Sequence, residues 1–383
     1  MKQKRMFLTA VSLAFVLSFA VAPRVFAAEL PPDTHAVSAF INGVSLKGPK
    51  TAAADDAEVY VPLRALMEMI GFEVTYDSET RTVSFDDGDT SITFALKSGI
   101  VKIDGVDFDR SEYRLIDGNL FVPLSFITDY FNRAALFIPE YKTDGDGTTT
   151  VSAIKIFSAY SVQLDSDILV SSLTYNYSED LDENGHVVTS QYAIPQFAGF
   201  GGKTFETSLN KTFSDIFYDN EQNILDTYKE ISESAADEIY SYASDMVYSF
   251  QYGDNGTFAV LLDGYDYAGG AHGLETRSSY VIDQAASKLL SLADVFKPDA
   301  DYKEILAKEM NKIRDTDSED WEIVNEITAN DLDSYDGYNF YFSGSELVIY
   351  YNPYDIAPYA RGLVEFKIPS ESLAPYLLEK YLG

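Results

Sequence analysis

Apolar and polar residues alternate with a period of two in many short segments of the chain, and this pattern predicts strands. These segments are residues 72–76, 83–85, 92–96, 135–138, 151–156, 162–177, 187–194, 246–252, 257–263, 279–283, 340–342, 347–351 and 363–368. Pro195 is expected to end the strand that begins at residue 187. Apolar residues recur at every third or fourth position in other segments, which predicts helices at 63–70, 205–217, 220–244, 289–296 and 370–381. Because strands and helices are mixed along the chain, the predicted fold class is α+β, with a duplicated hairpin and helix module first and a mixed antiparallel sheet with packed helices second.

An internal duplication organises the first part of the chain. Residues 41–44 (INGV) return as IDGV at 103–106, and residues 59–63 (VYVPL) return as LFVPL at 120–124. The Asn-Gly and Asp-Gly pairs predict tight hairpin turns, because both central residues of such a turn take positive φ. Gly71 follows the first predicted helix at a position that favours a left-handed residue. Each copy therefore predicts a hairpin, a helix and further strands.

The first 27 residues have the pattern of an export signal. Basic residues at positions 2, 4 and 5 precede an apolar segment at 6–22, and Val25 and Ala27 suit the two positions that a signal peptidase recognises. No cysteine follows that could carry a lipid, and no later apolar segment is long enough to span a bilayer. We therefore expect residues 1–27 to be a signal peptide. The mature protein is expected to be soluble, without a transmembrane anchor, and secreted or associated with the cell wall.

The chain is strongly acidic, and its charge excludes some classes of partner. It has 383 residues, of which 28 are Lys or Arg and 61 are Asp or Glu, for a net charge of −33. Without residues 1–27 the basic residues number 24 and the net charge is −37. Nucleic acids and anionic lipids are poor partners, because their phosphates need Lys and Arg, whereas cationic partners are attracted. The alternative is that the charge only keeps an exported protein soluble. The lack of cysteine excludes disulfides.

Four short elements in the first part carry a family resemblance. They are Tyr-Val-Pro-Leu-Arg at 60–64, Gly-Phe-Glu-Val at 71–74, the Asn-Gly pair and the second Val-Pro-Leu. With them, residues 36–157 resemble the copper amine oxidase N-terminal-like domain of secreted bacterial proteins. The resemblance implies a non-catalytic α+β module and no oxidase activity. An oxidase needs three His copper ligands, whereas the His residues here, His35, His186 and His272, are far apart in dissimilar contexts.

The second part, residues 160–383, carries another resemblance. Its elements are residues 192–200, 269–273, 289–296 and 338–359. They are similar to the paired domains of unknown function in the extracellular part of RsiV-type anti-sigma factors, which also occur beside the catalytic domain of some peptidoglycan deacetylases. The resemblance implies an α+β binding domain, which in the RsiV type senses lysozyme. Because no transmembrane helix is predicted after the signal, we do not expect a membrane-spanning anti-sigma factor.

The sharpest local motif is GGAHG at residues 269–273. The ordinary pKa of His is near 6.5, so His272 in a glycine-rich turn can serve as an acid–base group or as a recognition contact. The alternative is a structural turn, in which the glycines allow unusual backbone angles and His272 bonds to nearby carbonyl groups. Seven tyrosines lie within residues 335–359, where they either fill the core or form a binding surface, and Tyr354 is the best candidate for an exposed one. The predicted binding residues are Gly270, His272, Gly273, Tyr354 and Tyr359. No catalytic residue, metal ligand or cofactor is predicted.

These features together predict a secreted, non-enzymatic binding protein of the bacterial cell envelope. The predicted partner is a cell-wall glycan or a cationic envelope protein of the lysozyme kind, because an acidic surface rich in tyrosine suits either. One alternative is a hydrolase or deacetylase accessory that acts on wall polymers through His272. Another is a purely structural stalk or adaptor. An acid within hydrogen-bond reach of His272, in a cleft, would favour the enzyme.

Overall fold

The structure is a computed structural model, and it confirms the α+β fold class. It describes residues 35–47, 52–54, 59–110, 113–116, 118–124, 126, 135–145, 147–165, 167–181, 185–233, 241–316, 325–332 and 339–382. The predicted signal peptide at residues 1–27 lies outside the described residues. Within the described part of the chain, no helix is both long enough and apolar enough to cross a membrane.

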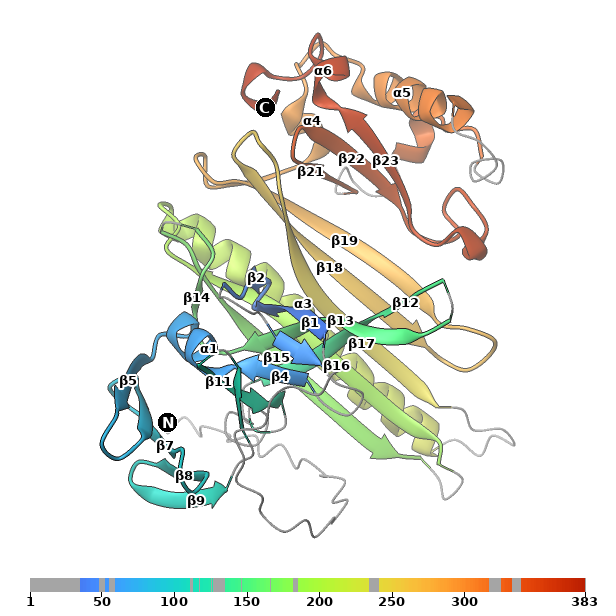
Figure 1. The fold of residues 1–383 in the computed structure, drawn as a ribbon. Coiled ribbons are helices and arrows are strands. Elements are labelled where there is room, and N and C mark those ends of the chain that lie inside the picture. Colours follow the sequence, from blue (N-terminus) through green and yellow to red (C-terminus); the bar gives the residue numbers. More distant parts are fainter. Residues whose placement is uncertain are drawn as a thin grey trace, which may run out of the picture.

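The N-terminal part contains two sheets and the helix α1 (Leu63–Met69) (Figure 1). The eight-stranded sheet has the order β10-β11-β4-β3-β1-β13-β12, with β2 paired to β1. Its strands are β1 (His35–Ile41), β2 (Val44–Ser45), β3 (Ala52–Ala54), β4 (Val59–Pro62), β10 (Arg114–Ile116), β11 (Asn119–Pro123), β12 (Ala135–Thr143) and β13 (Thr149–Ser158). The five-stranded sheet follows chain order, with β5 (Glu73–Asp77), β6 (Thr82–Asp86), β7 (Ser91–Ala95), β8 (Ile100–Ile103) and β9 (Val106–Arg110). The first and last strands, β1 and β13, pair in parallel, so the two ends of this part are joined.

The two copies of the duplicated sequence meet in the eight-stranded sheet. β4 of the first copy pairs antiparallel with β11 of the second, and Val61 lies opposite Val122. Both predicted hairpin turns are present. The two residues at 42–43 have φ angles of 49° and 77°, and the two at 104–105 have φ angles of 50° and 79°. Gly71, with a φ of 97°, follows the end of α1 as predicted.

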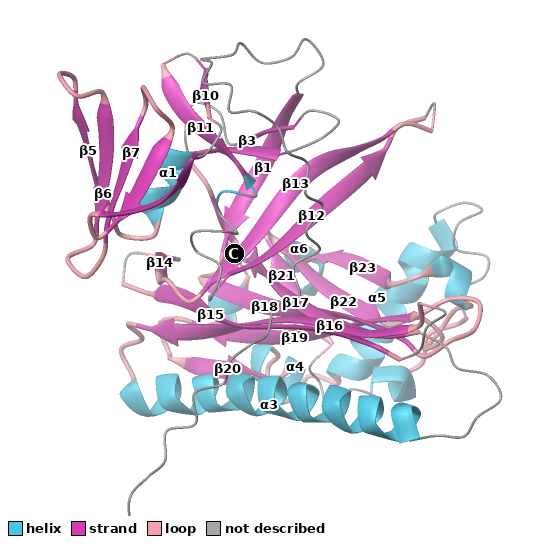
Figure 2. Ribbon diagram, turned by 90° about the horizontal axis from the view of Figure 1, so that it is seen from below, coloured by secondary structure: helices cyan, strands magenta, loops and turns pink. Residues whose placement is uncertain are grey.

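A seven-stranded sheet forms the framework of the C-terminal part, in the order β14-β15-β16-β17-β18-β19-β20. Its strands are β14 (Val162–Gln163), β15 (Leu169–Asp180), β16 (Val187–Ala198), β17 (Tyr242–Tyr252), β18 (Thr257–Tyr267), β19 (Leu274–Asp283) and β20 (Lys288–Leu290). Helix α3 (Lys203–Glu233) lies between β16 and β17 in the chain, and this long crossover allows the two strands to pair in parallel. Figure 2 shows α3 along one face of the sheet and strands β12 and β13 of the N-terminal part on the other.

The end of the chain forms a smaller layer around a three-stranded sheet, drawn in orange and red in Figure 1. It contains α4 (Leu292–Val295), α5 (Tyr302–Thr316), β21 (Phe340–Ser343), β22 (Glu346–Tyr351), β23 (Val364–Pro369), α6 (Ser370–Leu373) and the 3-10 helices η2 (Ala329–Leu332), η3 (Tyr359–Arg361) and η4 (Glu379–Tyr381). Leu261 of β18 and Val281 of β19 share one buried core with Leu306 of α5 and Phe366 of β23. This layer is therefore packed against the seven-stranded sheet.

Four predicted helical segments differ from the structure. The segments 205–217 and 220–244 were predicted as two helices, but they share the continuous helix α3, and residues 242–244 already belong to β17. Residues 289–296 divide between β20 and the single turn of α4. The predicted closing helix at 370–381 is replaced by α6 and η4, because Pro375 has no N–H with which to continue a helix.

The end of β16 and helix α5 also differ from the prediction. β16 continues past Pro195 to Ala198, and the proline is tolerated because β17 pairs with β16 only as far as Tyr192. Helix α5 was not predicted, although Leu306 and Met310 are fully buried at helical spacing.

Asn42 connects the N-terminal part to the C-terminal part. Its side chain is fully buried. The amide oxygen accepts hydrogen bonds from the backbone N–H of Ser158 at 2.7 Å and from the hydroxyl of Ser172 at 2.8 Å. The amide nitrogen donates to the carbonyl oxygens of Tyr160 at 2.8 Å and Val170 at 3.3 Å. One side chain therefore satisfies four polar groups from β13, β15 and the segment that links the two parts.

Candidate functional site

The loop between β18 and β19 carries the GGAHG motif. Gly269 and Gly270 have φ angles of 83° and 97°, in the region that favours glycine. The Nδ1 atom of His272 lies 2.9 Å from the carbonyl oxygen of Gly273. The hydroxyl of Tyr267 donates to the carbonyl oxygen of Gly270 at 3.2 Å. This geometry matches the structural interpretation of the motif, in which the glycines form the turn and His272 bonds to a nearby carbonyl.

Three of the predicted binding residues, His272, Tyr354 and Tyr359, form what we call the aromatic cluster. The ring of His272 stacks on that of Tyr359, with 3.6 Å between the centroids and 13° between the planes. The ring of Tyr354 lies 5.6 Å from that of Tyr359 and is tilted by 34°. His272 is exposed, and 61% of the surface of Tyr354 is exposed. The fold therefore brings residues from the β18–β19 loop and from the segment between β22 and β23 into one surface.

The two predicted glycines have different positions. A Cβ atom on Gly273 would lie 2.4 Å from the ring of Tyr265, so a glycine is required for that ring to occupy its place. A Cβ atom on Gly270 would meet no atom within 4 Å. Gly273 therefore positions Tyr265, whereas Gly270 shapes the loop through its positive φ.

A pair of backbone-directed hydrogen bonds holds the two segments of the site together. The side-chain oxygen of Asn352 accepts from the backbone N–H of Arg277 at 2.7 Å, and its amide nitrogen donates to the carbonyl oxygen of Arg277 at 3.2 Å. The guanidinium of Arg277 also bonds to Glu365 of β23 at 2.8 Å. β19 is thus fixed to the segment that carries Tyr354 and Tyr359.

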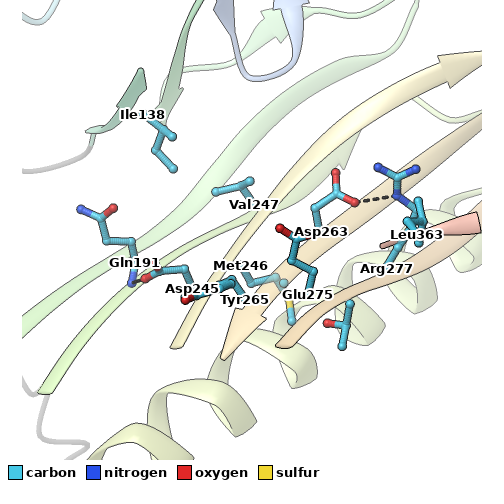
Figure 3. A pocket seen from close by; sticks show the side chains of 12 residues that line it. Ile138, Gln191, Asp245, Met246, Val247, Asp263, Tyr265, Glu275, Arg277 and Leu363 are labelled. Carbon is cyan, nitrogen blue, oxygen red and sulfur yellow. Dashed lines mark hydrogen bonds and ion pairs between the residues drawn. The ribbon is translucent and has the colours of Figure 1, made fainter. Parts of the chain in front are cut away.

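Beside the aromatic cluster, the surface is hollowed by a cavity of about 450 Å³ (Figure 3). We call it the junction hollow, because all three parts of the fold line it. It is lined by Ile138, Gln191, Asp245, Met246, Val247, Asp263, Gly264, Tyr265, Glu275, Thr276, Arg277 and Leu363. Asp245, Tyr265 and Glu275 are direct neighbours across β17, β18 and β19, so two carboxyl groups flank one aromatic ring.

Acidic side chains outnumber basic ones among the residues that line the hollow. Arg277 forms ion pairs with Asp263 at 2.6 Å and with Glu365 at 2.8 Å, and Figure 3 shows the first of these. Burial alone would lower the pKa of Arg277, but its bond to Asp263 and the charge of Glu365 raise the pKa overall. Burial also raises the pKa of Asp245, although the N–H of Gln191 bonds to its carboxylate at 2.9 Å and opposes the shift. Among the described residues that line the hollow, Arg277 is thus the one cation beside three carboxyl groups.

Within the part of the chain that the structure describes, no acidic side chain is hydrogen-bonded to His272. The contacts of His272 in the described structure are the carbonyl group of Gly273 and the ring of Tyr359, and neither is an acid. Among the described residues, no group of three or more His, Cys, Asp or Glu side chains is placed to hold a metal ion. The arrangement can stack flat ligands on its rings and accept hydrogen bonds or positive charge at its carboxylates.

Most residues of the hollow were not predicted from the sequence. Asp263 was predicted at the end of a strand and noted with Glu275 as an acid near the GGAHG motif, whereas Asp245, Tyr265 and Arg277 were not singled out. A signal did exist, because an acidic and an aromatic residue occupy alternate positions, 263 and 265, directly after the apolar residues 258–262 of the strand. Their cross-strand neighbours could not be identified without the register of the sheet.

Three family models match successive parts of the chain. Residues 40–137 match the copper amine oxidase N-terminal domain, residues 181–275 match the model described as deacetylase PdaC, and residues 293–371 match a protein of unknown function, DUF3298. These matches confirm the resemblances drawn from the sequence. The aromatic cluster and the hollow lie where the second and third matched regions meet, with Glu275 in one and Leu363 in the other.

Individual proteins are similar over parts of the chain. Peptidoglycan-N-acetylmuramic acid deacetylase PdaC of Bacillus subtilis strain 168 is 28% identical over 130 residues, which cover 33% of this chain and 27% of that protein. The chain thus spans about a quarter of that relative's length. A DUF3298 family structure from Bacteroides fragilis is 23% identical with a TM-score of 0.41, covering 56% of this chain and 94% of the other. A second, from Pseudomonas aeruginosa PAO1, is 17% identical with a TM-score of 0.43, covering 58% and 99%. The chain is therefore similar, in order, to a copper amine oxidase N-terminal domain, to part of PdaC and to DUF3298 proteins.

Proposed function

We propose that the protein is a non-catalytic binding protein of the bacterial cell envelope that recognises a cell-wall glycan. The observation that carries the proposal is the exposed aromatic cluster beside a carboxylate-lined hollow. Flat rings such as those of His272 and Tyr354 pack against the apolar faces of sugar rings, and carboxylates accept hydrogen bonds from sugar hydroxyls. The cavity volume of about 450 Å³ is within the range of small-ligand sites, about 300–1,000 Å³.

Two further observations support an envelope role. The first 27 residues have the pattern of an export signal. The region that holds β16, α3, β17 and β18 matches the model described as deacetylase PdaC, and a protein named for its action on peptidoglycan is 28% identical over 130 residues of the chain. The similarity covers about a quarter of that protein, so it supports the location and class of ligand rather than the deacetylase reaction.

A cationic envelope protein of the lysozyme kind is the second candidate partner. The net charge of −33 favours it, because an acidic surface attracts and steers basic proteins. Such steering weakens as salt is added, since the Debye length falls from about 10 Å at 0.1 M to about 3 Å at 1 M. Contacts made by ring stacking are less sensitive to salt. The salt dependence of binding therefore separates the two candidates.

The test is a co-sedimentation and pull-down experiment with residues 28–383, the form expected after export. Purified peptidoglycan and a basic lysozyme are the two probes, each at low and at moderate salt. The variant Tyr354→Ala removes an exposed ring of the cluster, and Tyr218→Ala removes an equally exposed ring on α3, on the opposite side of the sheet. We expect retention on peptidoglycan at both salt concentrations, reduced about fivefold or more by Tyr354→Ala and unchanged by Tyr218→Ala.

Other results would redirect the proposal. Retention on lysozyme alone, lost at moderate salt, would favour the cationic protein as partner. Equal effects of the two Tyr variants on peptidoglycan binding would show that the aromatic cluster is not the binding surface. If the protein is retained on neither probe, the purely structural stalk or adaptor is the remaining hypothesis.

A further inference from the structure

The junction hollow lies at the meeting point of all three parts of the fold. Ile138 comes from β12 of the N-terminal part, Val247 from β17 of the seven-stranded sheet, and Leu363 from the segment that precedes β23. Ligand sites occur preferentially at such domain junctions, because no single domain has to form the whole cavity. The N-terminal part, whose family resemblance implies a non-catalytic module, therefore contributes Ile138 to the lining of this site.

The hollow adjoins the aromatic cluster. Tyr265 lines the hollow, and its ring lies against Gly273, the residue next to His272. The pKa of Tyr359 is raised, first by burial and then by the negative charge of Glu275, which also lines the hollow. A ligand stacked on the cluster would thus extend directly toward the carboxylates.

The chemistry of the hollow favours a positively charged group over a neutral one. Asp245 and Glu275 flank the ring of Tyr265, and a cation beside an aromatic ring and a carboxylate gains from both. Asp263 is already paired with Arg277, whose other partner is Glu365, so the resident cation is fully engaged. The apolar side chains of Ile138, Val247 and Leu363 lower the local dielectric constant, which strengthens these interactions.

We propose that the junction hollow binds the ammonium group of an amino sugar, so that the protein recognises glycan from which acetyl groups have been removed. This inference rests on the glycan-binding function proposed above and names its ligand. In an N-acetylated sugar the same position holds a neutral acetamide, which gains little from two carboxylates. The rings of the aromatic cluster hold neighbouring sugars in either case. The hollow therefore determines the preference for the amino sugar, whereas the aromatic cluster binds both kinds of sugar.

The test compares two soluble oligosaccharides that differ only in this group. The probes are β-1,4-linked tetramers of glucosamine and of N-acetylglucosamine, titrated calorimetrically into residues 28–383 at pH 6, where an aliphatic amine is protonated. The variants are Asp245→Asn and Glu275→Gln, singly and combined. The control is Glu79→Gln, which removes one charge from the exposed turn between β5 and β6. Thermal unfolding of each variant verifies that it is folded.

We expect the glucosamine tetramer to bind about tenfold more tightly than the acetylated one. The combined variant should reduce this preference to under about threefold while its affinity for the acetylated tetramer stays unchanged, and Glu79→Gln should alter neither affinity. Equal affinities for the two tetramers, or a preference that survives in the combined variant, would overturn the inference and leave glycan binding intact. If neither tetramer binds and lysozyme does, the proposed glycan function fails as well, and the hollow becomes the site for a basic side chain.

Discussion

The two copies of the duplicated turn have the same backbone conformation and make the same pair of hydrogen bonds, but only the first copy is buried. In the first copy, the N–H of Asn42 donates to the carbonyl oxygen of Ile156 at 2.7 Å, and its side chain accepts from Ser158 at 2.7 Å. In the second, Asp104 makes both bonds with Ser91, at 2.8 Å and 2.9 Å. Asp104 is exposed, whereas Asn42 has no exposed surface. The duplicated sequence therefore determines the conformation of the turn, and the residues around it determine whether the turn connects the N-terminal part to the C-terminal part.

The difference between the two side chains follows from this contrast. An amide can accept and donate, whereas a carboxylate can only accept. The buried turn needs both abilities, because Asn42 donates to two carbonyl oxygens, of Tyr160 and Val170, that have left water. The exposed turn needs only an acceptor, and water solvates the rest of Asp104. The amide at position 42 is thus explained by the C-terminal part and not by the turn itself.

Exchanging the two residues tests this explanation most strongly. Asn42→Asp would place carboxylate oxygens against two buried carbonyl groups, and we expect a loss of stability on the order of 4 kcal/mol. Asp104→Asn keeps the acceptor for Ser91 and the tolerance for positive φ, so its expected effect is under about 0.5 kcal/mol. Denaturant unfolding of both variants at neutral pH measures the difference. Similar losses for the two variants would mean that Asn42 contributes only to its turn.

The glycines of the two turns offer a second comparison. Alanine at position 43 or 105 meets the same cost of positive φ, about 1–2 kcal/mol. At position 43 its Cβ would also lie 2.7 Å from the ring of Phe250 in β17, whereas at position 105 it would meet nothing within 4 Å. We expect Gly43→Ala to cost about 3 kcal/mol and Gly105→Ala about 1 kcal/mol by the same unfolding measurement. Equal costs would show that Phe250 moves aside without penalty.

The two turns show which features of the structure can be predicted from the sequence and which cannot. Asn-Gly and Asp-Gly pairs at a fixed offset predicted both hairpins, because the preference for positive φ is local. The burial of one turn depends on Phe250 and Ser172, which lie far along the chain in strands whose register no local pattern specifies. The same limit applies to the site. The glycines of the β18–β19 loop and the exposed Tyr354 were predictable, whereas the row of Asp245, Tyr265 and Glu275 exists only across three strands.

Helix ends illustrate a different limit. Leu373, Leu377 and Tyr381 fall at helical spacing and are all buried, so the periodicity correctly indicated buried positions. The backbone is nevertheless not a continuous helix, because Pro375 interrupts it between α6 and η4. The predicted division of α3 near residue 220 was wrong, because here the helix continues where an end was expected. Ile224 continues the buried face beyond Phe217, and the chain there has no proline or glycine to end the helix.

Where the two copies occupy equivalent places, their variants should behave alike. Val61 and Val122 face each other in β4 and β11, and both are fully buried. Replacing either with alanine removes two methyl groups from one core, so we expect each of Val61→Ala and Val122→Ala to cost about 2 kcal/mol. Thermal or denaturant unfolding verifies whether the two losses agree. A difference of more than about 1 kcal/mol would show that the two halves of the N-terminal part are not energetically equivalent.

The smallest expected effect concerns the end of the hydrogen-bond chain that begins at Asn42. Ser172 donates its single hydroxyl hydrogen to Asn42, so the 2.7 Å contact between Ser172 and Tyr248 is donated by Tyr248. Tyr248→Phe leaves Ser172 with its own bond intact and should cost about 1 kcal/mol near pH 8, as measured by denaturant unfolding.

The pH dependence of that variant is the sharper readout. Burial raises the pKa of Tyr248, and its bond with Ser172 opposes this only in part. The neutral phenol is therefore favoured in the folded state. Its contribution to the free energy of unfolding is complete below the pKa of about 10 that tyrosine has in the unfolded chain, and it is lost as the pH rises above that value. Wild type should lose up to about 1.4 kcal/mol per pH unit more than Tyr248→Phe above pH 10, and the two stabilities should meet near pH 11. A constant difference up to pH 11 would mean that the Tyr248 hydroxyl reaches water in the folded protein, and that the junction around Asn42 is open rather than sealed.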